Sequence, residues 1–533
     1  MGGPEARPAA FGPGPILTPR RLAGLLVLLV LGLGGLSLRL GQDLNFDLLN
    51  YHYYTGFAFV HGRTFRDMAP AGSQSYQPPL MHVLHYLGIA HLPPRLFGFL
   101  LGAIHALNLP LLFALGLAVL PRKPRSTIVP FALLAAVVGS LGPAAVSLLG
   151  TTFGDNLVSI PALLALVLVL HSGHEAGALR ASRLALAAGV LAGAATGLKL
   201  TMAAYHAALF AAAVLLWWHG GSLVKRLSLL TLGSLLGFLP TGGFWDFELW
   251  RRFGNPVFPF ANGIFRSEYQ SLENFRDTRY VVHSAYDLFR PLVDSALGRS
   301  ERLMEIGMRD VRFLLLLAAG LACVVLWVAS RVRRERLAPL DNRERAFLAW
   351  WITAYLAWAL AFYTYRYAAL LEFTAPLLLF VLLRRLSPAR HVLTAVAVAA
   401  LLIVATTRVE SWGRRAWQTP WLGLPVPALG LQPDSLILMV GQPSAFAIPS
   451  FREDARFVHL TAVERFRAPA KWNPLVEQAV RDHRGPLLLL SNFEFSRAEC
   501  EARAEAFGLR TTPRCEPVRN GSLRFRLCEL VKR

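Results

Sequence analysis

The chain contains many apolar runs of about 20 residues, and these runs constrain its fold more than any other feature. A hydrocarbon core of roughly 30 Å requires about 20 helical residues at 1.5 Å rise each. The 533-residue chain is 54% hydrophobic and only 16% charged, which excludes a single soluble core. The runs therefore predict an all-α polytopic membrane bundle.

We identify about eleven membrane spans from the lengths of these runs. Their approximate limits are 21–40, 95–120, 127–149, 156–171, 182–198, 201–219, 227–245, 312–330, 346–363, 368–383 and 391–407. The first run is too long for the apolar part of a signal peptide, and no cleavage site follows it. We therefore expect it to remain as a membrane anchor.

Lysine and arginine gather in every second short connection, which places those connections in the cytoplasm. The residues that carry this pattern are Arg122, Lys123, Arg125, Arg180, Arg183, Lys225, Arg226, Arg331, Arg333, Arg334, Arg336, Arg384, Arg385 and Arg390. Residues 1–20 are then a cytoplasmic tail. A first outer loop, 41–94, a second outer loop, 246–311, and everything after Arg408 face outward. Although the formal charge is +21, the basic residues follow this topology and form no stripe suited to nucleic acid.

The pattern changes after a Pro-rich linker, residues 411–433. Strands are expected at 434–440, 456–460, 486–491 and 523–530, with helices near 474–483 and 496–507. Ser496 and Glu499 have the spacing of a capping box at the start of the second helix. Residues 434–533 are therefore predicted to form a small extracytoplasmic α/β domain, whereas 21–410 form the transmembrane domain.

Two of the four cysteines have the spacing of a cross-strand pair. A two-residue turn at Gly521-Ser522 places Cys515 and Cys528 opposite each other on a hairpin, where side chains approach closely. We predict a disulfide, which requires an oxidising compartment. Two free thiols are the alternative, and a turn at Asn520-Gly521 would shift the register.

The first outer loop is rich in polar and aromatic side chains. On an α-helix, Asp47, Asn50, Tyr51 and Tyr54 fall on one face, which presents a carboxylate, an amide and two phenols. Such a face can hold a sugar. The alternative is an interfacial helix whose aromatic side chains form a belt at the membrane surface.

Residues 47–54, together with Gly62-Arg63, Asp67, Pro70-Ala71 and 74–79, resemble the first outer loop of bacterial GT-C glycosyltransferases. These are multi-span membrane enzymes that use polyprenyl-phosphate sugars. Three further segments, 150–155, 197–201 and 254–262, resemble a subset of the same proteins. The resemblance implies a GT-C-like fold over the transmembrane domain and an acidic catalytic base in this loop. Asp47 matches that base, and Asp43 is the second candidate.

Four ionisable residues fall at the outer ends of spans in this topology, namely Asp47, Asp155, Lys199 and Arg366. Charged groups near hydrocarbon usually face a protein interior, so we expect one cavity. The alternatives are snorkelling for Lys199 and Arg366 and a helix N-cap for Asp155. Asp47 and Asp155 are the expected catalytic carboxylates, and Lys199 and Arg366 the expected phosphate ligands. The expected substrate-binding residues are Asp43, Asn50, Tyr51, His52, Tyr54, Arg63, Gln74 and Tyr76.

The resemblance implies transfer of a hexose or pentose from a polyprenyl phosphate to a glycan, lipid or protein acceptor outside a bacterial inner membrane, with inversion. We expect no cofactor; a divalent cation held by Asp47, Asp155 and His52 is the alternative. A transporter or flippase of lipid-linked sugars would place polar groups nearer the bilayer midplane. A non-catalytic envelope assembly protein would leave Asp47 unexplained. The second outer loop is either a lid over the donor or an interfacial segment.

Overall fold

The computed structural model describes residues 18–120, 125–173, 177–218, 222–273, 279–333, 340–464, 466–492, 495–520 and 523–533. Most of the tail 1–20 lies outside these residues. So do the topology markers Arg122, Lys123, Arg334 and Arg336 and the expected turn Gly521-Ser522.

Every expected span coincides with helical structure. The helices of the bundle are α1 (Pro19–Leu40), α4 (Pro94–His105), α5 (Asn108–Val119), α6 (Arg125–Ser140), α7 (Pro143–Ser147), α8 (Asp155–His171), α9 (Ala178–Leu198), α10 (Ala203–Trp217), α11 (Leu223–Phe238), α15 (Arg312–Val332), α16 (Asn342–Ala361), α17 (Ala369–Leu386) and α18 (Val392–Thr406). In the described part of the chain, seven helical segments are long and apolar enough to cross a membrane, and three more are shorter apolar helices. In hydrocarbon a helix satisfies its own backbone, so apolar runs of this length take that form.

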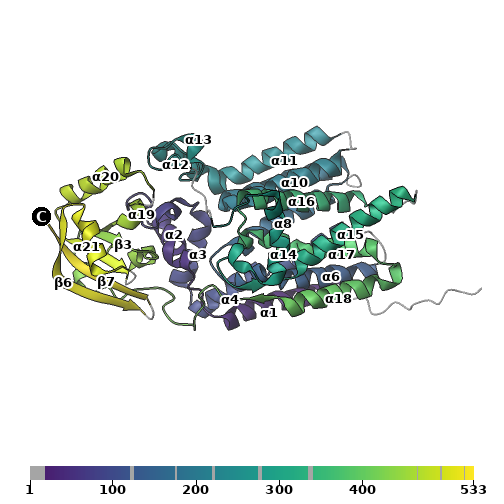
Figure 1. Ribbon diagram of the computed structural model, residues 1–533, viewed down its shortest axis with the longest axis horizontal. Coiled ribbons are helices and arrows are strands. Elements are labelled where there is room, and N and C mark those ends of the chain that lie inside the picture. Colours follow the sequence, from purple (N-terminus) through teal and green to yellow (C-terminus); the bar gives the residue numbers. More distant parts are fainter. Residues whose placement is uncertain are drawn as a thin grey trace, which may run out of the picture.

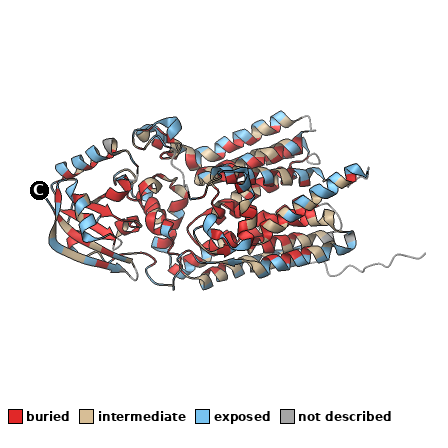
Figure 2. Ribbon diagram, in the orientation of Figure 1, coloured by how far each residue is buried: buried red, intermediate tan, exposed pale blue. Residues whose placement is uncertain are grey.

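The long helices run side by side and form one bundle, on the right in Figure 1. Helix α17 lies at the centre, with 83% of its apolar stretch buried, whereas α1 is only 11% buried. Large apolar side chains on α1, α11, α15 and α18 stay exposed and colour the outer helices blue in Figure 2. Since exposed apolar surface is stable against lipid, this pattern is that of a bundle facing a bilayer.

Helices α9 and α11 approach each other closely through glycines. A Cβ atom on Gly193 would lie 2.0 Å from the carbonyl oxygen of Ser234, and one on Gly237 would lie 2.0 Å from that of Val190. Small residues allow helix backbones to meet in membranes, where no hydrophobic effect drives helices together.

The first outer loop folds into short helices between the bundle and the terminal sheet (Figure 1). They are the π-helix η1 (Leu48–His52), α2 (Tyr53–Val60), the 3₁₀ helix η2 (Gly72–Tyr76) and α3 (Leu80–His91). The second outer loop contains α12 (Phe244–Phe253), which follows the π-helix η4 (Leu239–Gly243), then α13 (Asn262–Phe265), α14 (Arg290–Leu297) and the strand β1 (Met308–Arg309), which pairs with β2 (Arg408–Val409).

The terminal region holds a five-stranded sheet of order β4-β3-β5-β7-β6. Its elements are β3 (Leu436–Val440), β4 (Arg456–His459), α19 (Leu460–Glu464), α20 (Pro469–Asp482), β5 (Leu487–Asn492), α21 (Arg497–Glu505), β6 (Leu509–Asn520) and β7 (Leu523–Lys532). Strands β4, β3 and β5 are parallel, and β7 and β6 are antiparallel additions. Ser496 and Glu499 form the capping box of α21.

The hairpin of β6 and β7 pairs Cys515 with Cys528, and the two residues form a disulfide. Asn520 pairs with Leu523 next to the turn, which is the register that brings the cysteines opposite each other.

The segment 411–433 is not a free linker. The indole nitrogen of Trp421 donates to the carbonyl of Asp43, and Arg414 donates to the carbonyls of Gly41 and Leu149. These contacts fasten the segment to the start of the first outer loop and to the residues after α7.

Candidate functional site

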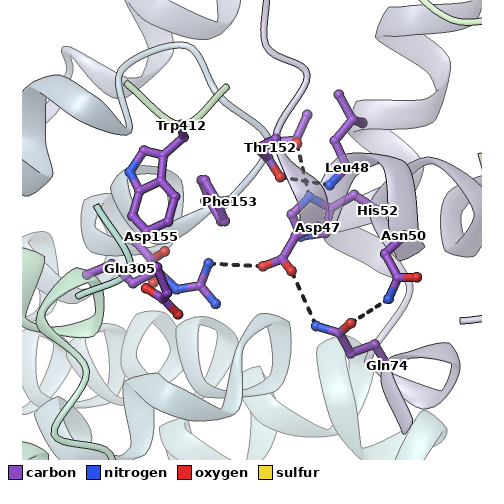
Figure 3. A network of polar contacts seen from close by, with 12 residues as sticks. Asp47, Leu48, Asn50, His52, Gln74, Thr152, Phe153, Asp155, Glu305 and Trp412 are labelled. Carbon is purple, nitrogen blue, oxygen red and sulfur yellow. Dashed lines mark hydrogen bonds and ion pairs between the residues drawn. The ribbon is translucent and has the colours of Figure 1, made fainter. Parts of the chain in front are cut away.

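Asp47 and Arg366 form an ion pair where the first outer loop meets the bundle (Figure 3). A terminal guanidinium nitrogen of Arg366 lies 2.9 Å from Oδ2 of Asp47, and Gln74 donates to Oδ1 at 3.3 Å. Arg366 belongs to the 3₁₀ turn η7 (Tyr365–Ala368) that precedes α17. The Asp47 side chain is 9% exposed and that of Arg366 is 12% exposed, so the pair is buried but still reaches the surface of the site.

Asp155 and Lys199 form a second ion pair. The Nζ atom of Lys199 lies 2.6 Å from Oδ1 of Asp155 and also donates to the carbonyl of Phe153 at 2.9 Å. Asp155 is the first residue of α8 and follows Gly154, whose φ of +81° favours glycine. Lys199 breaks the helical run between α9 and α10. The Asp155 side chain is only 1% exposed, whereas that of Lys199 is 17% exposed.

Aromatic rings join the two ion pairs into one site. The guanidinium of Arg366 lies 4.6 Å from the ring centroid of Phe153 and 5.0 Å from that of Tyr367, whose hydroxyl it also contacts at 3.0 Å. Lys199 lies over the same Tyr367 ring at 5.2 Å. Cations are stabilised over aromatic faces. The structure thus brings together the four charged residues that the sequence analysis placed at one depth.

Trp412 and Glu305 also belong to the surroundings of Arg366 and were not identified from the sequence. The Trp412 ring lies 5.8 Å from the guanidinium. Glu305, in the second outer loop, is labelled in Figure 3, interacts electrostatically with Arg366 and pairs with Arg279 at 3.1 Å. Trp412 and Glu305 each lie in a segment with many aromatic or charged residues. The local sequence therefore does not distinguish them from their neighbours.

Asp43, which the sequence analysis placed among the substrate-binding residues, is held by neighbouring polar groups. It is fully buried, and its carboxylate accepts hydrogen bonds from the backbone and hydroxyl of Thr152 at 2.8 and 2.9 Å and from the side chain of Asn45 at 2.7 Å. These bonds fasten the first outer loop to the turn that carries Phe153 and Asp155. The substrate-binding role of Asp43 stays a prediction.

The expected single face of Asp47, Asn50, Tyr51 and Tyr54 is interrupted. Residues Leu48–His52 form a π turn, which holds one more residue than an α turn and therefore rotates the next residues about the helix axis. Asn50 stays with Asp47 because both bond Gln74, at 2.6 Å and 3.3 Å. Tyr54 instead turns away and donates to Asp67 at 2.8 Å.

Arg63 faces the terminal domain and not the site. It pairs with Asp67 at 3.0 Å and donates to the carbonyls of Glu453 and Ala455 beside β4. Asp67 in turn accepts from the backbone of Phe457 at 3.1 Å. Burial raises the pKa of the Asp67 carboxyl, and the Arg63 guanidinium opposes that rise. Neither Arg63 nor Tyr54 contacts the Asp47 pair, so both hold the first outer loop against the sheet.

Tyr76 lies in an aromatic cluster away from Asp47. Its ring packs on Phe253 and Phe258 of the second outer loop and on Phe466 of the terminal domain, with centroid distances of 4.9, 5.3 and 6.2 Å. Its carbonyl accepts from the indole of Trp245 at 2.9 Å. Tyr76 therefore anchors η2, the element that carries Gln74.

His52 belongs to a buried histidine cluster beside the site. Its ring stacks on His82 at 4.8 Å and lies 6.1 Å from His85, while Tyr51 meets His52 edge-on at 4.3 Å. Thr152 gives its only hydroxyl proton to Asp43, so Nδ1 of His52 donates to Thr152, 2.9 Å away. Burial lowers the pKa of all three histidines, for His82 to about 3. The cluster is neutral at neutral pH.

Among the described residues, no group of three or more His, Cys, Asp or Glu side chains has an arrangement that could hold a metal ion. The site instead offers two buried cations, each paired with one carboxylate. Guanidinium and ammonium groups bind phosphate strongly, and a carboxylate can accept a proton. The arrangement thus suits a phosphorylated ligand and a proton transfer next to it.

No protein-family model matches the chain, and no curated protein matches it in sequence. Solved structures do match. ArnT from Cupriavidus metallidurans bound to undecaprenyl phosphate superposes with a TM-score of 0.57 at 15% identity, over 96% of this chain and 98% of that chain. The apo state of the same ArnT gives 0.53 at 15% identity, over 95% and 97%. The chain therefore has the fold of ArnT along nearly its whole length, which confirms the all-α membrane bundle with a terminal α/β domain expected from the sequence.

Proposed function

We propose that this protein is a membrane glycosyltransferase that moves a hexosyl or pentosyl group from a polyprenyl phosphate to an extracytoplasmic acceptor. The observation that carries the proposal is the Asp47–Arg366 ion pair, which joins a proton acceptor to a phosphate ligand at 2.9 Å. The ArnT structure of the same fold was solved with undecaprenyl phosphate, a polyprenyl phosphate. That neighbour supports a lipid-linked donor here.

Arg366 and Lys199 are the proposed phosphate ligands. Both are side chains at the outer end of the bundle, and both lie against Tyr367, so one phosphate can contact both. A phosphate leaves the sugar as an anion, and buried cations stabilise the charge that develops as the bond breaks. Lipid-linked donors can enter from the bilayer because the site is at the ends of the helices.

Asp47 is the proposed general base, and Asp155 is the proposed positioning residue for Lys199. The Asp47 side chain is 9% exposed and lies next to the polar groups of Asn50 and Gln74, whereas that of Asp155 is 1% exposed and bonded to Lys199. A base must reach the acceptor hydroxyl within hydrogen-bond distance. The greater exposure of Asp47 supports it, rather than Asp155, as the base.

The proposed reaction is one displacement at the anomeric carbon. Asp47 takes the proton of the acceptor hydroxyl, the acceptor oxygen bonds to the anomeric carbon, and the bond to the phosphate oxygen breaks with its electron pair. Such a single step inverts the anomeric centre. Donor phosphate on Arg366 competes with Asp47 for the guanidinium, and Asp47 is then free to bond the acceptor hydroxyl.

We place the enzyme in a bacterial inner membrane with the N-terminus in the cytoplasm and the site outside. The positive-inside pattern and the disulfide in the terminal domain support this orientation. Residues 21–410 are the proposed catalytic membrane domain and residues 434–533 the proposed extracytoplasmic domain, joined by residues 411–433. No metal participates in the proposed step.

The test is sugar transfer by the purified protein in lipid, with radiolabelled polyprenyl-phosphate hexoses and pentoses and an envelope extract as acceptor. Asp47→Asn keeps the side-chain size and removes the base, so transfer should fall by a factor of about 100 or more. Asp482→Asn, on an exposed residue at the end of α20, is the matched control and should transfer at the wild-type rate.

Undiminished transfer by Asp47→Asn, with loss in Asp155→Asn, would move the base to Asp155. A wild-type protein that carries labelled lipid across vesicles but transfers no sugar would contradict the proposal and favour a flippase.

A further inference from the structure

A groove of about 530 Å³ lies between the end of α2 and helix α12, away from the Asp47 site. It is lined by Phe59, Gly62, Thr64, Phe65, Arg66, Phe244, Trp245, Glu248 and Arg252. None of these residues contacts Asp47, Asp155, Lys199 or Arg366 in a hydrogen bond or ion pair among the described residues. The groove is therefore a second place where a ligand can bind.

Helix α11 leads to the groove, and its sequence indicates the depth of the groove in the membrane. No charged residue occurs between Arg226, at the inner end of α11, and Asp246 in α12. This interval of about 20 residues at 1.5 Å rise matches the roughly 30 Å hydrocarbon core. Glu248 and Arg252, which follow Asp246, then lie in the layer of lipid headgroups.

The groove continues the lipid-facing surface of α11. Leu235, Leu236 and Leu239 are 52 to 56% exposed on that surface, and Phe244 and Phe247 of α12 follow at 37% and 60%. Exposed aromatic residues at the edge of an apolar surface are typical of a membrane interface. A lipid whose chains lie along α11 would therefore have its headgroup at the mouth of the groove.

Two arginines at the mouth of the groove have guanidinium nitrogens that can donate further hydrogen bonds. The guanidinium of Arg252 lies 3.9 Å from the ring centroid of Phe65, and its Nε atom contacts Glu248 at 2.5 Å. Arg66 gives one terminal nitrogen to the carbonyl of Asp454 at 2.5 Å. Their other guanidinium nitrogens have no hydrogen-bond partner in the described part of the chain, and both residues are exposed. Glu248 is the only acid in the lining, so the groove carries a net positive charge.

We propose that this groove binds the phosphate headgroup of an anionic glycerophospholipid, with Arg66 and Arg252 as its phosphate ligands and α11 as the support for its acyl chains. The bound lipid would also brace the active region, because Trp245 of the groove donates to the carbonyl of Tyr76 at 2.9 Å. Tyr76 ends η2, which carries Gln74, the residue that donates to Asp47. The proposal does not depend on the proposed sugar transfer.

The test is native mass spectrometry of the full-length protein in detergent with added phosphatidylglycerol or phosphatidylcholine. Wild type should retain one phosphatidylglycerol about tenfold better than phosphatidylcholine, and the double variant Arg66→Gln/Arg252→Gln should lose that preference. Arg251→Gln is the matched control. It removes an exposed arginine of the same helix that pairs with Glu248 but does not line the groove, so it should keep the preference.

Equal retention of the two lipids by wild type, or equal loss in the control and the double variant, would overturn the proposal. Inorganic phosphate at millimolar concentration distinguishes the sources of the anion. If it displaces the bound lipid completely, the groove is a site for free phosphate. If undecaprenyl phosphate displaces phosphatidylglycerol in the wild type, the groove belongs to the donor path and the assignment to a glycerophospholipid is wrong.

Discussion

Arg366 donates a hydrogen bond to Asp47 at 2.9 Å, although the two residues are 319 positions apart in the chain. The pair connects the first outer loop to the start of α17, which belongs to the most buried of the seven candidate membrane spans in the described part of the chain. A phosphate that binds Arg366 meets the carboxylate of Asp47 as its competitor. In the proposed reaction, donor binding and release of the base would thus be linked through one guanidinium.

Replacement of Arg366 tests this link. In Arg366→Gln the loss of a charge-assisted contact should raise the KM for the lipid-linked donor by about tenfold or more, since such contacts contribute about 1.5–3 kcal/mol. Arg366→Lys keeps the charge but not the two-pronged geometry, so it should recover part of the affinity. Arg497→Gln, on an exposed arginine of α21, is the control and should leave KM unchanged. Equal KM values in all three variants would contradict a phosphate role for Arg366.

The Asp155–Lys199 pair predicts a stability effect that differs between single and double variants. Lys199→Met leaves the Asp155 carboxylate buried without its partner, which should lower the free energy of unfolding by about 3–5 kcal/mol. Lys199→Met/Asp155→Leu removes both charges and should regain most of that loss. The thermal midpoint in detergent measures both. A double variant less stable than either single variant would show that the two side chains do not act as a pair.

The histidine cluster predicts acid sensitivity. Burial lowers the pKa of His82 from its ordinary value to about 3, so between pH 6.5 and 3 the unfolded chain binds the proton and the folded chain does not. Stability therefore falls as the pH drops through this window, by about 2 kcal/mol at pH 5 for this one residue.

His82→Gln stays neutral at every pH and should flatten the decline in thermal midpoint between pH 7 and pH 5. His91→Gln, on an exposed histidine of the same helix α3, should retain the wild-type slope. Identical slopes in the two variants would exclude His82 as a source of the acid sensitivity.

The disulfide predicts a local effect of reduction. The bridge between Cys515 and Cys528 closes a loop with a sequence separation of 13 residues, and a crosslink of that size contributes about 3 kcal/mol. Cys515→Ser/Cys528→Ser should therefore raise proteolytic cleavage within β6 and β7 while the membrane bundle stays intact. Cys323→Ser, which removes a free thiol of α15, is the control. Cleavage at the wild-type rate in the double variant would contradict a stabilising role for the bridge.

Residue patterns local to the sequence were sufficient for much of the architecture. Apolar runs predicted the helical spans because a helix in hydrocarbon needs only its own length and composition. The capping box of Ser496 and Glu499 and the cross-strand position of Cys515 and Cys528 also depend on short spacings. The membrane bundle followed from these runs, and the resemblance carried by the short motifs of the outer loops implied the same fold.

Which residues make up the site depended on contacts between segments that are distant in the sequence. The outer ends of spans indicated Asp47, Asp155, Lys199 and Arg366, because topology alone puts such residues at one depth. Sequence spacing could not show that the π turn after Asp47 rotates Tyr54 toward Asp67. Nor could it show that Arg63 bonds the edge of the terminal sheet, since that partner lies 390 positions away.

By itself, the sequence determined which segments form long apolar helices and that an α/β region follows them, because these features follow from the periodicity and hydropathy of neighbouring residues. The tertiary structure alone decided which carboxylate pairs with which cation, that Asp43 is buried and bonded to Thr152, and that His82, Trp412 and Glu305 lie around the site. The physical reason is that ion pairs, stacked rings and buried hydrogen bonds depend on distances in space, which packing of the whole bundle sets.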